Sequence, residues 1–113
     1  MTNPAGAVVS VEVLFVGSCP HHDLLVADLR ALLAATGNAY QLRERRIDTG
    51  AQARAECFLG SPTGRIDGVD VDPTATGRRD YGMACRLYPT RSGLRGAPPD
   101  DWIPAALPDT QPA

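Results

Sequence analysis

Cysteine is scarce in this chain, lysine is absent, and long apolar runs are missing. There are 3 cysteines in 113 residues, and all 11 basic side chains are arginine. Three cysteines exclude an iron–sulfur cluster held by four cysteine ligands, and a net charge of −2 gives little attraction for a phosphate backbone. No run approaches the roughly 18 apolar residues of a membrane span. We therefore expect no nucleic acid and no membrane among the partners.

The two ends of the chain carry little patterned sequence. The start, MTNPAGAVVS, has no positively charged segment ahead of an apolar run, so no secretion signal is expected. A cytoplasmic location follows, where cysteines are usually reduced. Residues 1–7 and 108–113 are expected to be flexible. Hydrophobic residues make up 43% of the chain, which suits a single domain, placed here at residues 8–107.

The hydrophobic pattern of residues 8–107 predicts elements in the order β-α-β-α-β-β-α. Residues 8–16 (VVSVEVLFV) are apolar and β-branched almost throughout, whereas leucines recur at helical spacing after Pro20. Asp-Gly favours a hairpin turn, and the glycine- and proline-rich residues 73–98 favour a long loop. The expected strands are residues 8–16, 40–47, 63–66 and 69–71, and the expected helices run from Pro20 to Thr36, from about Ala51 to Gly60, and from Asp100 or Asp101.

This order predicts an α/β fold with a four-stranded mixed sheet and helices on both faces. A β-α-β unit gives two parallel strands with a right-handed crossover, and the hairpin adds two antiparallel strands. The first strand then ends at the edge where the third strand begins, and the fourth strand ends at that same edge, near Asp72. The loop that contains Cys85 therefore leaves from the side of the sheet on which Cys19 follows the first strand.

Cys19 is the residue most suited to chemistry. It stands in FVGSCPHHD, where the first strand gives way to the first helix, and Pro20 suits the first position of a helix. Unpaired N–H groups and the helix dipole favour a thiolate there, and His21 and His22 add positive charge when protonated. Such surroundings lower a cysteine pKa from about 8.5 to between 3.5 and 7.5. The alternative is an inert, partly buried cysteine.

Several short motifs carry a resemblance to a known fold. CPHH, FLGSPT with Ser61-Pro62-Thr63, IDG, DYG with CRLY, and GAPPDDWI, in that order, resemble the thioredoxin fold over roughly residues 8–107. More narrowly, they resemble small bacterial thioredoxin family proteins, which are sometimes grouped with alkylmercury lyases. The resemblance implies that Pro62 is a cis proline facing Cys19. The usual second cysteine of the motif is replaced by His22, so no dithiol can form within the motif.

Cys85 is the candidate second thiol, provided that its Cα lies within about 7 Å of that of Cys19. The alternative is that it packs beneath the loop with Met83 and Leu87. Cys57, in the second expected helix, is interpreted as a core or incidental surface residue. Three aromatic residues are expected to have packing roles: Tyr81 and Tyr88 hold the loop down, and Trp102 anchors the last helix against the sheet.

These residues predict a thiol-dependent protein. In one version, Cys19 exchanges with a small thiol or a protein disulfide, and Cys85 or glutathione resolves the mixed disulfide. In another, Cys19 and Cys85 are metal ligands that capture mercury or an organomercurial, with Asp80 or Asp23 as the acid. The expected catalytic residues are Cys19, Cys85, Pro62 and His22, and no cofactor is expected. A metal site of Cys19, His22 and Cys85 is conceivable, without any zinc spacing signature. The alternative is a catalytically silent thioredoxin-like module that binds a partner beside Pro62.

Overall fold

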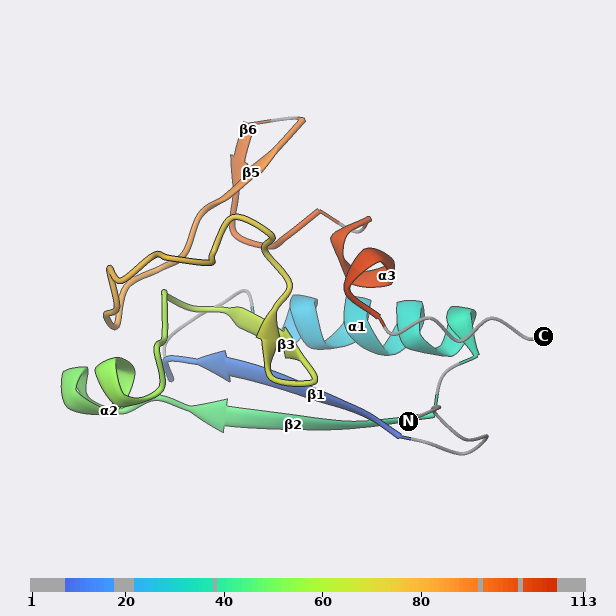
Figure 1. Cartoon of the computed structure of the whole chain (residues 1–113), viewed down its shortest axis with the longest axis horizontal. Helices are drawn as coiled ribbons and strands as arrows, with labels where there is room; N and C mark the ends of the chain where they lie inside the picture. Colours follow the sequence, from blue (N-terminus) through green and yellow to red (C-terminus); the bar gives the residue numbers. More distant parts are fainter. Residues whose placement is uncertain (1–7, 18–21, 38, 92, 100, 108–113) are drawn as a thin grey trace.

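The computed structural model of the chain describes residues 8–17, 22–37, 39–91, 93–99 and 101–107, and the structural statements below concern those residues. Figure 1 shows a mixed α/β fold in which four strands form one sheet. The elements are β1 (Val9–Phe15), α1 (His22–Thr36), β2 (Tyr40–Arg46), α2 (Gly50–Ala55), β3 (Thr63–Ile66), β4 (Val69–Asp70), β5 (Tyr88–Thr90), β6 (Gly93–Arg95) and α3 (Trp102–Ala106).

The main sheet is mixed and has the order β2-β1-β3-β4. β1 runs parallel to β2, with Val13 opposite Glu44, and antiparallel to β3, with Leu14 opposite Thr63. The short β4 returns antiparallel to β3 after the Asp67-Gly68 turn, where both residues have positive φ angles. The α/β class, the four-stranded mixed sheet and the order of its elements are therefore as predicted from the sequence.

Alternation along β1 divides the core between the two faces of the sheet. On one face, the valines of β1 pack against the leucines of α1 and against Ile103 of α3, in a cluster of Val9, Val11, Val13, Leu25, Leu29, Leu33, Ile66, Val71 and Ile103. On the other face, Leu14 packs with Ile47, Ala53 and Phe58, around α2. α1 and α3 thus share one face, and α2 covers one end of the other (Figure 1).

The second helix is shorter than the expected span to Gly60. It ends in a Schellman motif, in which the N–H of Cys57 donates to the carbonyl of Arg54 and the N–H of Phe58 donates to that of Ala53. Cys57 therefore occupies the left-handed position after the helix, with a φ of 54°, where glycine is the usual residue. The prediction that Cys57 lies within the helix is wrong, and its side chain is exposed.

The expectation that residues 73–98 form a long loop is only partly right. Part of the segment is a second, two-stranded sheet, in which Tyr88, Pro89 and Thr90 pair with Arg95, Leu94 and Gly93. Earlier in the segment, the N–H of Gly82 donates to the carbonyl of Phe58, so the loop runs along the chain that leads into β3. Within the part of the chain that the structure describes, no helix has the length and apolar character to cross a membrane.

Candidate functional site

The edge of the sheet where β3 begins is built around the Ser61-Pro62 peptide bond. This bond is cis, as the resemblance implies, and both residues are buried. The hydroxyl oxygen of Ser61 accepts the N–H of Val16, the residue that follows β1, at 3.1 Å. The end of β1 and the start of β3 are thus joined at one place. We call Val16, Ser61, Pro62 and Cys85 the Pro62 edge.

Cys85 is held directly beside Ser61. The N–H of Ser61 donates to the carbonyl of Ala84 at 2.8 Å, and the N–H of Arg86 donates to the carbonyl of Ser61 at 2.8 Å. The Cys85 thiol is free and exposed, and the side chains of Met83 and Leu87 are exposed as well. The alternative in which Cys85 packs beneath the loop with those two residues is therefore wrong. The topological prediction that Cys85 approaches the edge where β3 begins agrees with the structure.

Gly60 permits this close approach of two chain segments. It has a φ of +128°, and a Cβ atom there would lie 3.0 Å from the Cβ of Arg86 and 3.1 Å from the carbonyl oxygen of Ala84. Contacts of this length are tighter than nine in ten that real Cβ atoms make, so the neighbouring segment would have to shift by a few tenths of an ångström. The glycine before Ser61 is thus a condition for the position of Cys85.

A buried arginine fastens the residue after Cys85 to the sheet. The Arg86 side chain is only 1% exposed. Its guanidinium donates to both carboxylate oxygens of Asp70, at 2.7 and 3.1 Å, to Asp72 at 3.3 Å and to the hydroxyl of Thr63 at 3.0 Å. This network ties Cys85's neighbour to β3, to β4 and to Asp72, two residues after β4, so the segment has a fixed register on the sheet.

The charges of this network stabilise one another. Burial opposes the charged form of Arg86, but the hydrogen bonds and charge of Asp70 and Asp72 raise the pKa of the guanidinium. Burial likewise opposes the charged form of Asp72, yet the hydroxyl and N–H of Thr74, together with Arg86, lower its pKa. Both groups are therefore charged at neutral pH. The sequence offered no local signal for them, because Arg86 lies 14 and 16 positions from its carboxylate partners.

Tyr88 completes the anchoring of the loop. Its ring is fully buried under the Arg86 guanidinium, whose central carbon lies 4.5 Å from the ring centroid, and its hydroxyl donates to the carbonyl of Pro62 at 2.5 Å. Burial raises the pKa of Tyr88, so the hydroxyl keeps its proton. Trp102 meets this ring edge-on, with centroids 6.1 Å apart. Tyr88 holds the loop down as predicted. The residue of α3 that is buried in the core against the sheet is Ile103, whereas the contact of Trp102 is with Tyr88.

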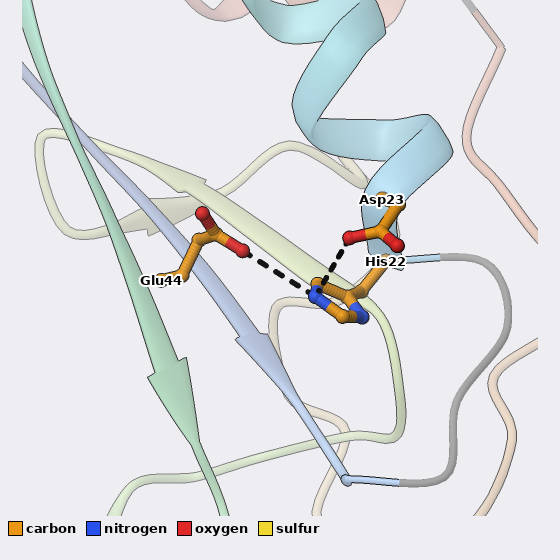
Figure 2. A group of neighbouring side chains, drawn as sticks. All are labelled: His22, Asp23 and Glu44. Atoms are coloured by element: carbon orange, nitrogen blue, oxygen red, sulfur yellow. Dashed lines mark ion pairs between the residues drawn. The ribbon is translucent and has the colours of Figure 1, made fainter.

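His22 is the first residue of α1, and its imidazole ring faces β2 (Figure 2). The ring stacks on Phe15 with a centroid separation of 3.9 Å, and its Nε2 atom lies 3.1 Å from Asp23 and 3.3 Å from Glu44. Cys19 and His21 lie outside the described residues. The contact between Cys19 and Cys85, and the position of Cys19 opposite Pro62, therefore stay predictions.

Asp80 does not suit the role of a proton donor. Its carboxylate accepts two hydrogen bonds from Arg78, at 3.0 and 2.6 Å. These bonds, with a backbone N–H and the Arg78 charge, lower the pKa of Asp80. A general acid near neutral pH needs a raised pKa instead. Asp80 is thus a paired carboxylate, and the proposed protonation of a departing carbon by this residue is not supported.

Cys57 and Tyr81 meet on the other side of the loop. Both line a hollow of about 490 Å³ bounded by the end of α2, by β4 and by residues 72–81. A hydrogen bond with Cys57, together with some burial, raises the pKa of Tyr81. Cys57 is therefore in contact with the loop through Tyr81.

A scan against protein-family models, a search of curated proteins and a search of solved structures find no match to this chain.

Proposed function

We propose that this chain is a thioredoxin-like thiol protein in which Cys19 attacks a disulfide and Cys85 resolves the product. The observation that carries the proposal is the placement of Cys85, exposed and free, in the segment that pairs with Ser61. Ser61 also binds the N–H of Val16, and Cys19 follows Val16 by three positions in the sequence. Two thiols assigned to the same edge of one sheet are the minimum for internal resolution of a mixed disulfide.

The fold supports the thioredoxin-like part of the proposal. The main sheet has the strand order and directions expected for the β-α-β-α-β-β-α arrangement, and the prolyl bond that opens β3 has the isomer that the resemblance implies. α1 begins just beyond the Cys19-Pro20 pair in the sequence. A thiolate near the first turn of a 15-residue helix is favoured by the helix dipole.

The surroundings of the two thiols favour Cys19 as the attacking thiol and Cys85 as the resolving one. The only described cation adjacent to Cys85 in sequence, Arg86, is neutralised by two carboxylates, Asp70 and Asp72. It therefore serves to hold the segment in place. Activation of the attacking thiol is assigned to Cys19, where the helix terminus and the neighbouring imidazoles favour the charged sulfur.

The exchange is written as two substitutions at sulfur. The Cys19 thiolate attacks one sulfur of a substrate disulfide, a mixed disulfide forms, and the first substrate thiolate leaves. The Cys85 thiolate then attacks the Cys19 sulfur, the internal disulfide forms, and the second substrate thiolate leaves. The substrate gains two electrons and the protein loses two. Two molecules of a small thiol such as glutathione then reduce the internal disulfide and leave as their own disulfide, which returns the protein to its dithiol state.

Mercury capture is a second use of the same thiols. Each thiolate displaces one ligand of a mercury compound and forms a sulfur–mercury bond, with no redox change. Soft thiolate ligands suit soft metals. Because Asp80 is held in its charged form by Arg78, this version stops at capture and does not extend to cleavage of a carbon–mercury bond by Asp80.

The test uses an aromatic disulfide that releases a coloured thiolate, with Cys57 replaced by serine because its exposed thiol would also react. The Cys57→Ser protein should release two equivalents and end with an internal disulfide, seen by mass spectrometry as the loss of two hydrogen atoms. The additional Cys85→Ser change should stop the reaction at one equivalent with a stable mixed disulfide. The additional Cys19→Ser change should remove the fast phase.

The alkylation rate of Cys19 against pH separates this function from a silent binding module. A midpoint below about 7 supports an activated attacking thiol, whereas a midpoint near 8.5 is that of an ordinary cysteine. The proposal fails if Cys19 shows the ordinary midpoint and the Cys57→Ser protein forms two mixed disulfides without an internal bond. The chain would then be a thioredoxin-like module without exchange chemistry.

A further inference from the structure

Three side chains with metal-binding donor atoms converge between α1 and β2. His22 and Asp23 are the first two residues of α1, and Glu44 comes from β2 (Figure 2). One imidazole nitrogen and two carboxylate oxygens lie within 4.8 Å of one another. None of these contacts involves Cys85 or the Pro62 edge; His22 is the one member that the cluster shares with the surroundings proposed to activate Cys19.

Packing within the fold sets the orientation of the His22 imidazole in the absence of an ion. Phe15, the last residue of β1, lies parallel to the His22 ring within 6° at a centroid distance of 3.9 Å. In the β1–β2 register, Glu44 lies opposite Val13, on the same face as Tyr40 and Leu42, which pack toward α1. Stacking on Phe15 of β1 thus sets the plane of the His22 ring, and Glu44 of β2 supplies a carboxylate close to Nε2.

The spacing of the donor atoms matches that of ligands around one small cation. Metal–nitrogen and metal–oxygen distances near 2.1 Å place neighbouring ligands about 3.0 Å apart in octahedral and about 3.4 Å apart in tetrahedral geometry. The Nε2 atom of His22 lies 3.1 Å from Oδ1 of Asp23 and 3.3 Å from Oε1 of Glu44. Both separations are within this range, and the two carboxylate oxygens lie within 4.8 Å of each other, so one ion can be accommodated once the carboxylates close around it.

The donor set also has a chemical preference. An imidazole with two carboxylates favours first-row divalent ions, whereas magnesium and calcium prefer oxygen ligands alone. The two carboxylates supply two negative charges, and Arg46, the next residue on this face of β2, is ion-paired to Asp48 at 2.8 Å. The positive end of α1 opposes a cation, which limits the affinity of the site.

We propose that His22, Asp23 and Glu44 bind one divalent transition-metal ion, with Zn²⁺ as the probe ion. Three protein ligands leave at least one coordination position open for water or a small ligand. The His22 side chain is 16% exposed, whereas Glu44 is 42% exposed, so the ion is reached from solvent on the carboxylate side. The site does not depend on thiol exchange, because no cysteine is among its ligands.

The test separates this site from zinc bound by thiols. All three cysteines of the full-length chain are replaced by serine, and Zn²⁺ binding is measured by isothermal titration calorimetry. One equivalent is expected. His22→Ala and Glu44→Gln should each weaken binding at least tenfold, the scale expected when metal-site residues are removed. Asp101→Asn, which makes the same charge change at an exposed residue without a side-chain cap bond, and His21→Ala should leave binding unchanged.

Cobalt spectra of the wild-type chain give a second measurement if the serine variant does not fold. Co²⁺ bound by His22 and the carboxylates should lack the intense thiolate-to-metal charge-transfer band that cysteine ligands produce, and the His22→Ala change should remove the spectrum. The inference is overturned if the folded serine variant binds no Zn²⁺, if Glu44→Gln has no effect, or if His21→Ala removes binding while His22→Ala does not. If Zn²⁺ binding is found but the disulfide assay shows no thiol exchange, only the proposed function is overturned.

Discussion

Replacing Arg86 with methionine should destabilise the protein by about 3–5 kcal/mol, because it leaves the buried carboxylate of Asp72 and the half-buried one of Asp70 without their cation. The Asp72 side chain is 2% exposed, so it cannot be rehydrated without local opening, whereas Asp70 is 15% exposed and is rehydrated in part. Domains of ordinary stability have about 5–15 kcal/mol in total. At a urea m-value near 1.5 kcal/mol/M, the unfolding midpoint should fall by about 2–3 M.

The effect of this substitution should depend on pH. The pKa of Asp72 is lowered in the folded wild-type protein, so its contribution to stability is present at pH 7 and is lost as the pH falls through the folded pKa. Without Arg86, burial acts against the charged carboxylate with less opposition, and the pKa of Asp72 should rise. Protonation of Asp72 then removes the unpaired buried charge from the variant. The difference in unfolding free energy between variant and wild type should therefore become smaller as the pH is lowered from 7 to 4.

Urea unfolding followed by circular dichroism measures both effects. Arg91→Met removes the same charge from an exposed residue in the β5–β6 turn and should change stability by less than about 0.5 kcal/mol. Adding Asp70→Asn and Asp72→Asn to Arg86→Met should recover part of the loss. A loss below about 1 kcal/mol at pH 7, or a difference that widens in acid, would refute the assignment of Arg86 as the buried cation of this network.

Three further substitutions test the packing around the Pro62 edge and the backbone at the end of α2. Gly60→Ala should destabilise by about 2–3 kcal/mol and speed alkylation of Cys85, because a Cβ would lie 3.0 Å from Arg86; Gly68→Ala, also at positive φ but with nothing within 4 Å, should lose less stability in urea and leave the alkylation rate unchanged. Tyr88→Phe should cost about 1–3 kcal/mol in thermal or urea unfolding, since the Pro62 carbonyl loses its donor, and a change below 0.5 kcal/mol would contradict that bond. Cys57→Gly should raise stability by up to about 1 kcal/mol in the same assay, because glycine accepts a φ of 54° more readily; a net loss would mean that the Cys57–Tyr81 contact outweighs the backbone strain.

The elements with strong local patterns were predictable from the sequence. The apolar run of β1, the leucine spacing of α1 and the Asp67-Gly68 turn each carry their signal within a few residues, and the structure places them within one or two positions of the prediction. The β5–β6 hairpin was not predictable in this way. Its strands have three residues each, and Pro89 in β5 lowers the expectation of a strand.

The contacts that position the candidate site were harder to predict from the sequence. The resemblance led to Pro62, and topology led to Cys85, but no local pattern shows that Arg86 is buried, since arginine is usually exposed. Its carboxylate partners are Asp70, in β4, and Asp72, two residues after β4, and the pairing depends on the three-dimensional course of the loop. The convergence of His22 with Glu44 is likewise long-range, because it depends on the register of β2 against β1.

The pairing of Ser61 with its own chain restricts what can dock there. Its amide hydrogen and its carbonyl oxygen are both engaged by the segment around Cys85. An incoming polypeptide therefore finds no vacant main-chain group on Ser61 with which to form an added strand, the usual way in which extended peptides are recognised at a sheet margin. A low-molecular-weight disulfide needs no such pairing, so the proposed thiol exchange, if it occurs at this edge, should favour glutathione-sized compounds over protein clients.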